Sequence, residues 1–178
     1  MIHGCNHDHS DERKIYEKSY ADKMIAIRMF REEGNKHFMA KELSSAAVSY
    51  RRSLLYLDYT FAEKEKDDDE IDRERFKCHL NLAATKLDQM DFSEAIAQCR
   101  LALQIDSTSS KAHYRKGFAH LKRSEYYEAQ EHLYKAMKLA ASDTHENRRP
   151  IEDAIRDLNI KMRDYKKRSA EIAKSALK

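Results

Sequence analysis

The amino-acid sequence predicts an all-α fold in which a pair of helices is repeated along the chain. Its 178 residues include only 3 glycines and 1 proline, whereas sheets, barrels and phosphate-binding loops need many more turn residues. The residues that dominate the chain, Ala, Leu, Lys, Arg and Glu, are strong helix formers. Charged residues make up 37% of the chain and the mean hydropathy is −0.89, which suits a thin stack of helices with much surface per residue.

Matching residues recur at fixed offsets, which is the sequence sign of a repeat protein. An offset of 34 relates one set of five residues to the next: Ala83, Phe92, Ala95, Cys99 and Ala102 match Gly117, Tyr126, Ala129, Leu133 and Ala136. An offset of 49 relates an earlier set to the first of these: Gly34, Leu43, Ala46, Tyr50 and Ser53. Because 49 minus 34 is 15, an insertion of 15 residues is expected between the first and second repeats.

The helices are predicted in pairs, at about 20–40 and 43–60, 70–89 and 92–105, and 109–123 and 126–140. Each first helix carries a small residue that lets its partner approach closely, at Gly34, Ala83 and Gly117. Each second helix carries a matching small residue, at Ala46, Ala95 and Ala129. A bulky residue is expected to fill the turn within each pair, at Leu43, Phe92 and Tyr126. The three pairs together form one repeat domain over 20–144.

Two segments flank this domain and one interrupts it. Residues 1–19 form a polar N-terminal segment, and residues 145–178 form a C-terminal capping helix that becomes helical after Pro150. The insertion occupies about 57–72 and carries four consecutive acidic residues, 67–70. It is expected to lengthen both flanking helices and to present a solvated acidic surface rather than a binding site.

This pattern resembles the tetratricopeptide repeat, whose period is about 34 residues. The resemblance implies three helix pairs that stack into a right-handed superhelix, with the first helices of the pairs lining its concave face. The sequence lacks the proline with which repeats of this family often end, since the second and third repeats have Ser107 and Ala141 at those places. This departure affects only the helix ends.

The last helix has an apolar stripe at helical spacing, formed by Ile151, Ala154, Ile155, Leu158, Met162 and Tyr165. A stack of repeats exposes apolar surface at its final repeat, so a helix that covers this surface is expected there. Residues 148–178 also contain ten Lys and Arg against five Asp and Glu. An external partner such as calmodulin, an anionic surface or RNA stays open as a second interpretation of this basic helix.

The composition argues against several kinds of site and partner. Three cysteines are too few and odd in number for a disulfide framework, and Cys78 and Cys99 fall at apolar positions of the helices. His3, Cys5, His7 and His9 cluster in the polar terminus, where nothing orients them as metal ligands. No apolar stretch approaches about 18 residues. We therefore expect a cytoplasmic protein without a metal, cofactor, membrane or nucleic-acid partner.

Five polar residues are predicted to point into the concave groove. They are Arg31 and Asn35, Asn81, and Lys111 and Arg115. Arg31 and Asn35, like Lys111 and Arg115, are four residues apart and share a helix face. Three cations and two amides in one groove would suit a ligand rich in carboxylates.

The run from about Arg31 to Leu139 resembles the repeat domain of large immunophilins and related co-chaperones. So do the long insertion and the segment His79–Leu87, H-L-N-L-A-A-T-K-L. This resemblance implies a clamp for the Glu-Glu-Val-Asp tail of heat-shock chaperones of the ninety- or seventy-kilodalton class. Arg31, Asn35 and Asn81 would hold the terminal Asp, and Lys111 and Arg115 would hold upstream groups. The family usually has Lys in place of Arg31, which changes the reach and geometry of the charge.

Two other functions are open at this stage. One is a structural scaffold whose groove binds an internal helix or a folded surface, so that its partner needs no free C-terminal carboxylate. The other is peptidyl-prolyl isomerase activity, which the resembled proteins often carry in a separate domain. The repeats and the last helix occupy nearly the whole chain, so we expect a non-catalytic binding module. His113 is interpreted either as a groove residue or as a packing residue.

Overall fold

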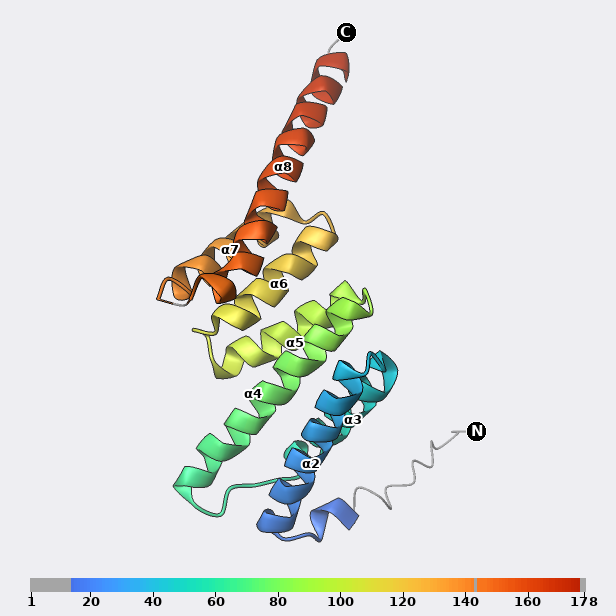
Figure 1. The fold of residues 1–178 in the computed structure, drawn as a ribbon, viewed down its shortest axis with the longest axis vertical. Coiled ribbons are helices and arrows are strands. Elements are labelled where there is room, and N and C mark those ends of the chain that lie inside the picture. Colours follow the sequence, from blue (N-terminus) through green and yellow to red (C-terminus); the bar gives the residue numbers. More distant parts are fainter. Residues whose placement is uncertain (1–13, 143, 177–178) are drawn as a thin grey trace, which may run out of the picture. The chain divides into compact units, whose positions relative to one another are not determined.

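A computed structural model describes residues 14–142 and 144–176, and this part of the chain contains helices and no strand. The repeat helices are α2 (Tyr20–Met39), α3 (Leu43–Asp58), α4 (Glu65–Asp88), α5 (Phe92–Ile105), α6 (Ser110–Lys122) and α7 (Tyr126–Leu139). The last helix is α8 (His145–Ala176). Figure 1 shows the hairpins formed by α2 with α3 and by α6 with α7. The predicted all-α fold and the helix order are confirmed.

The chain divides into two compact units, Met1–Leu82 and Ala83–Lys178, with the boundary inside α4. The first unit has a core between α2, α3 and the first part of α4, built around Ile27, Leu57 and Cys78. The second unit has its core between α6, α7 and α8, built around Leu133 and Leu158. None of the helices in the described ranges is both long enough and apolar enough to cross a bilayer.

Small residues bring the helices of a pair into close contact, as the repeat pattern predicts. A Cβ atom added to Gly34 would lie 2.6 Å from the ring of Tyr50 on α3. One added to Gly117 would lie 2.9 Å from the backbone nitrogen of Leu133 on α7. Ala46, Ala95 and Ala129, the small residues predicted on the second helices, are fully buried. Side chains larger than these would force the paired helices apart.

The turn within each pair follows one recurring design that the sequence pattern did not predict. A residue with positive φ ends each first helix, at Lys41 (63°), Met90 (59°) and Ser124 (63°). The next residue donates its backbone N–H to a carbonyl five positions earlier: Glu42 to His37 (2.9 Å), Asp91 to Lys86 (2.9 Å) and Glu125 to His120 (3.0 Å). This is the hydrogen bond of a Schellman motif.

The two residues that this backbone hydrogen bond joins in each turn also contact each other through their side chains. The contacts are His37–Glu42 (2.6 Å), Lys86–Asp91 (3.4 Å) and His120–Glu125 (2.7 Å). The acidic residue is in every case the first residue before the second helix, at its N-cap. A negative charge at that position is favourable because it faces the positive end of the helix dipole.

The insertion differs from its prediction in two respects. It lengthens α4 at its start, but α3 ends at Asp58 and a loop follows it. Asp67 is buried and accepts hydrogen bonds from the backbone N–H groups of Glu63 and Lys64, at 3.3 and 2.9 Å. Glu70 accepts a hydrogen bond from the Tyr20 hydroxyl on α2 at 3.0 Å. The prediction of a purely solvated acidic surface is therefore wrong for these two carboxylates, which fix the loop and α2.

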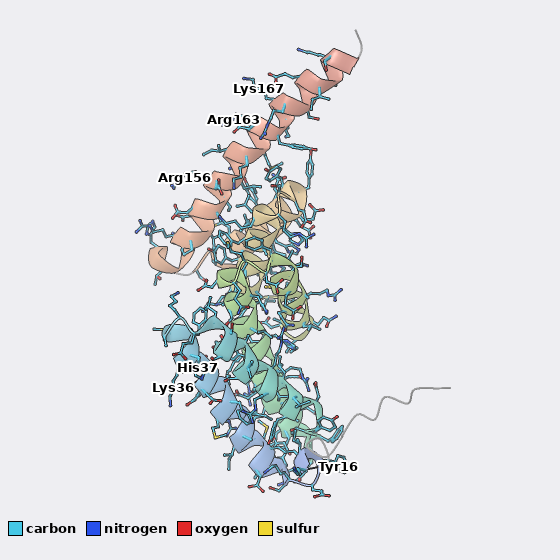
Figure 2. The ribbon with its side chains drawn as sticks, turned by 90° about the vertical axis from the view of Figure 1, so that its right-hand side faces the viewer. Tyr16, Lys36, His37, Arg156, Arg163 and Lys167 are labelled. Carbon is cyan, nitrogen blue, oxygen red and sulfur yellow. The ribbon has the colours of Figure 1, made fainter. Side chains whose placement is uncertain are left out.

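The last helix starts at His145, where the predicted capping segment 145–178 begins, and it continues through Pro150 rather than starting after it. Pro150 lies inside the helix, where its ring nitrogen cannot donate the usual backbone hydrogen bond. The predicted apolar stripe does cover the last repeat: Ile151, Ala154, Leu158 and Met162 are buried in clusters with residues of α6 and α7. Arg156, Arg163 and Lys167 project from another side of the helix (Figure 2).

Candidate functional site

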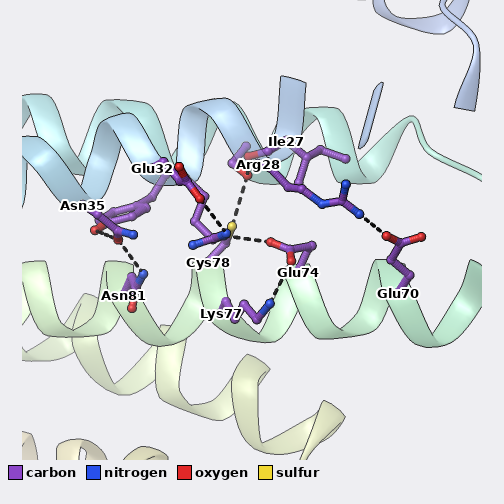
Figure 3. A network of polar contacts seen from close by, with 12 residues as sticks. Ile27, Arg28, Glu32, Asn35, Glu70, Glu74, Lys77, Cys78 and Asn81 are labelled. Atoms are coloured by element: carbon purple, nitrogen blue, oxygen red, sulfur yellow. Dashed lines mark hydrogen bonds and ion pairs between the residues drawn. The ribbon is translucent and has the colours of Figure 1, made fainter. Parts of the chain in front are cut away.

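Two of the predicted groove residues contact each other directly within the first unit. The Asn81 side chain donates from Nδ2 to Oδ1 of Asn35 at 2.9 Å, and the Tyr50 hydroxyl donates to the same oxygen at 2.8 Å. Figure 3 shows Asn35 and Asn81 facing one another from α2 and α4. Because both bonds end on the Asn35 oxygen, its NH2 group is oriented away from them and presents two N–H donors.

Arg31, one turn before Asn35, lies against a buried carboxylate. Its Nε donates to Oε2 of Glu74 at 2.8 Å, and its side chain is only 15% exposed. Lys77 contacts the other oxygen of Glu74, also at 2.8 Å. Burial disfavours the charged form of Glu74, but the hydrogen bonds from Lys77 and Arg31 outweigh it and lower the pKa of this carboxyl. Arg31 therefore neutralises Glu74, a role that the sequence did not suggest.

The polar contacts continue along α2 and α4 beyond Arg31. Arg28 pairs with Glu70, and Figure 3 shows this pair in line with Glu74 and the two asparagines. In the same view Cys78 lies between the Arg28–Glu70 pair and the two asparagines. It is fully buried, and its sulfur is 3.1 Å from the Ser53 hydroxyl. Burial raises the pKa of the Cys78 thiol to about 11. This thiol is a packing residue, as predicted.

The other two predicted groove residues lie in the second unit. Lys111 is exposed and Arg115 is partly buried, and they are one turn apart on α6. Cys99 on α5 is fully buried. Burial raises the pKa of its thiol to about 12, although the positive charge of Arg115 opposes the rise. The five predicted residues thus lie as three in the first unit and two in the second.

His113 is a packing residue and belongs to a ladder of three imidazole rings between α6 and α7. Its ring stacks on His132 with centroids 5.3 Å apart, and His132 stacks on His120 at 5.9 Å. The Nδ1 atoms of His113 and His132 are 3.1 Å apart, while Nε2 of His113 lies 3.2 Å from the Ser107 carbonyl oxygen.

These contacts determine which ring nitrogens carry protons when the rings are neutral. A carbonyl oxygen can only accept, so Nε2 of His113 carries its proton and its Nδ1 accepts one from Nδ1 of His132. Burial, followed by the charge of Lys116 and the neighbouring His113, lowers the pKa of His132 to about 4. Burial also lowers the pKa of His113. The seven-residue spacing of His113 and His120 was the only sequence sign of this ladder.

Within the residues that the structure describes, no group of three or more His, Cys, Asp or Glu side chains is arranged to hold a metal ion. The N-terminal cluster of His3, Cys5, His7 and His9 lies outside the described residues.

The chain is similar to known proteins in both structure and sequence. The C-terminal TPR-containing domain of a Plasmodium falciparum FK506-binding protein superposes with a TM-score of 0.71, at 27% identity, over 84% of this chain and 99% of that domain. The chain has a tetratricopeptide-repeat fold. In sequence it is 28% identical over 131 residues to the peptidyl-prolyl cis-trans isomerase FKBP4 of Bos taurus. No family model matches the chain.

The match to FKBP4 covers 74% of this chain but only 28% of the cattle protein, so the chain corresponds to little more than a quarter of that relative. A third similar protein has been solved with a ligand. The first TPR of Spaghetti (RPAP3), bound to the HSP90 peptide SRMEEVD, has a TM-score of 0.58 at 19% identity, over 75% of this chain and 94% of that one. This likeness concerns the fold.

Proposed function

We propose that the chain is a co-chaperone module that binds the acidic C-terminal tail of a heat-shock chaperone ending in Glu-Glu-Val-Asp. The observation that carries the proposal is the amide pair Asn35–Asn81, which Tyr50 orients through its hydroxyl. Two oriented amides beside a guanidinium form a donor-rich surface, and carboxylates are the ligands that such surfaces prefer. The bound HSP90 peptide of the RPAP3 repeat domain supports this choice of ligand.

In the first unit, the NH2 groups of Asn35 and Asn81 would donate to the terminal Asp of the tail. Arg31 uses Nε for Glu74, and its guanidinium carries five N–H groups in all. One of its NH2 groups lies 3.5 Å from the exposed Glu32 carboxylate, and a carboxylate of the ligand would replace Glu32 at this group. Glu74 in turn holds the guanidinium in place, which reduces the entropy that Arg31 loses when the peptide binds.

The second unit contributes a separate pair of cations. Lys111 and Arg115 share one face of α6, and we assign them to carboxylate or carbonyl groups upstream of the terminal Asp. Each charge-assisted hydrogen bond contributes about 1.5–3 kcal/mol. Because the short peptide loses chain entropy, we expect micromolar affinity, about −8 kcal/mol.

The proposed role is non-catalytic and cytoplasmic. The matched part of FKBP4 is a fraction of that isomerase, and we assign any isomerase activity to sequence outside this chain. The two described cysteines are free and buried, which agrees with a reducing compartment.

The direct test is a titration of the chain with a fluorescent SRMEEVD peptide and with the same peptide amidated at its C-terminus. Micromolar binding that is lost on amidation, and that weakens as salt rises, is the expected result. Equal binding of both peptides would show that the free carboxylate is not recognised and would favour a scaffold for internal segments.

Three variants test the residues. Asn35→Asp keeps an oxygen for Tyr50 and Asn81 but replaces the donors by a negative charge, so binding should fall by more than about tenfold. Lys111→Ala and Arg115→Ala should each weaken binding by about tenfold. Lys138→Ala, which removes an exposed cation from α7, is the matched control and should bind like the parent. Circular dichroism checks that every variant is folded.

A further inference from the structure

The first unit has a second cation next to its two asparagines. Lys77 is on α4, four residues before Asn81, so the two side chains share one face of the helix. Its ammonium contacts Oε1 of Glu74 at 2.8 Å, and Figure 3 shows Lys77 beside Glu74 on the same helix. An ammonium carries three N–H donors, and this one contact does not use all of them.

Lys77 also occupies a repeat position at which a groove cation is already predicted. Lys77 and Asn81 precede Lys111 and Arg115 by the repeat offset, since 111 − 77 and 115 − 81 both equal 34. Corresponding positions of successive repeats serve the same surface of a repeat protein. Lys77 is therefore at a groove position of its own repeat, although it was not among the five predicted residues.

Arg31 and Lys77 contact the same carboxylate but differ in how far solvent reaches them. The Arg31 side chain is 15% exposed and that of Glu74 is 7% exposed, so this pair is largely shielded. The Lys77 side chain is 49% exposed. One buried carboxylate between two cations leaves one positive charge in excess, and the exposed Lys77 is the cation that an approaching anion can reach. A ligand carboxylate can contact Lys77 without separating Arg31 from Glu74.

The terminal Asp of the proposed ligand offers two carboxylates within a single residue. When the asparagine pair binds the main-chain carboxylate, the side-chain carboxylate of the same residue lies close by. Lys77 is one helical turn, about 5.4 Å, from Asn81 along α4. The flexible four-carbon stem of a lysine covers that distance.

We infer that Lys77 binds the side-chain carboxylate of the terminal Asp, while Asn35 and Asn81 bind its main-chain carboxylate. This inference rests on the proposed function and names the residue that selects aspartate at the end of the tail. The exposed lysine charge that the family usually has at the place of Arg31 is supplied here from α4. A tail that ends in Asp therefore binds more tightly than the same tail ending in Asn.

The test is a double-mutant cycle between Lys77→Ala and the last residue of the peptide, with SRMEEVD and SRMEEVN as the two ligands. In the parent, replacement of the terminal Asp by Asn should weaken binding by about tenfold. In Lys77→Ala the same replacement should weaken binding by less than about threefold. Lys36→Ala, which removes an exposed cation from α2, is the matched control and should behave as the parent.

A second variant separates direct binding from an effect through Glu74. Glu74→Gln keeps an oxygen for Arg31 and Lys77 but removes the negative charge. Lys77→Ala should weaken binding of SRMEEVD by about tenfold in this background as well. Loss of the effect there would show that Lys77 acts only by neutralising Glu74 and would overturn the inference. Circular dichroism checks that the variants are folded.

A third measurement needs no substitution in the protein. In the 15N-labelled parent, the ammonium signal of Lys77 should shift more on saturation with SRMEEVD than with SRMEEVN. Amidation-sensitive binding without this difference and without coupling would overturn the inference and leave the proposed function intact. Absence of any amidation-sensitive binding would overturn both.

Discussion

Acidification should destabilise the α6–α7 hairpin through the histidine ladder. The pKa of His132 is about 4 in the folded chain against an ordinary value of 6.5. The unfolded chain therefore binds a proton more readily than the folded chain between these two values. Stability from this source is fully present above about pH 6.5 and is lost as the pH falls towards 4.

The magnitude follows from the pKa difference. At about 1.4 kcal/mol per pKa unit, the lowering of the His132 pKa from 6.5 to about 4 corresponds to roughly 3 kcal/mol of folding stability. His132 is partly exposed, so solvent screening reduces this to about 2 kcal/mol. A charged His132 would also lie beside Lys116 and Lys135, which disfavour its positive charge.

Urea unfolding of the parent and of His132→Gln at pH 7.0 and pH 4.5, followed by circular dichroism, measures this effect. Glutamine is expected to keep an N–H donor for His113 but cannot titrate. The parent should therefore lose about 2 kcal/mol more than the variant between the two pH values. His145→Gln, at a histidine whose side chain is 74% exposed, should lose as much as the parent. Equal losses in the parent and in His132→Gln would refute the reasoning.

Two further predictions concern stability. Leu158→Ala should destabilise the second unit by about 2–5 kcal/mol, because Leu158 is fully buried and the substitution leaves a cavity. Urea unfolding measures this loss beside that of Ile160→Ala, a control at a residue that is 53% exposed. Similar losses in the two variants would contradict the docking of α8. Met90→Gly should stabilise the chain by roughly 0.5–1 kcal/mol, because Met90 has a φ of 59° that glycine adopts without strain. Asp72→Gly, at an exposed position inside α4, should instead destabilise by about 1 kcal/mol, and a loss in both variants would rule out relief of backbone strain.

The sequence predicted the helices well because small and bulky residues mark the pairs directly. Gly34 and Gly117 were identified by their offsets, and the structure shows the side chains that require them, Tyr50 and Leu133. The turns were not predicted because their positive φ falls on Lys41, Met90 and Ser124, which carry none of the usual signal of glycine. A proline usually marks a helix boundary, which predicts a helix after Pro150, whereas α8 continues through this residue.

The predicted clamp residues all lie on the helices where they were expected. The contacts that each of their side chains makes could not be predicted from the sequence. That Asn35 and Asn81 contact one another depends on how α2 and α4 pack, which residue spacing within one helix cannot show. That Arg31 neutralises Glu74 depends on a buried carboxylate 43 positions further along the chain. Pairings between distant residues leave no mark on helical periodicity, so the histidine ladder was likewise found only in the structure.

The recurring turn limits where this chain can change length. Its backbone hydrogen bond and its ion pair both join residues five positions apart, as in Lys86 and Asp91. A single added residue inside that span would break both contacts. A residue added between Phe61 and Ala62, in the loop between α3 and α4, would leave the hydrogen bonds of Asp67 to Glu63 and Lys64 in place. The inserted 15 residues do lie in that stretch between repeats. Each hairpin is therefore constrained to a fixed length, and the links between hairpins are the places where added residues or a tag are expected to be tolerated.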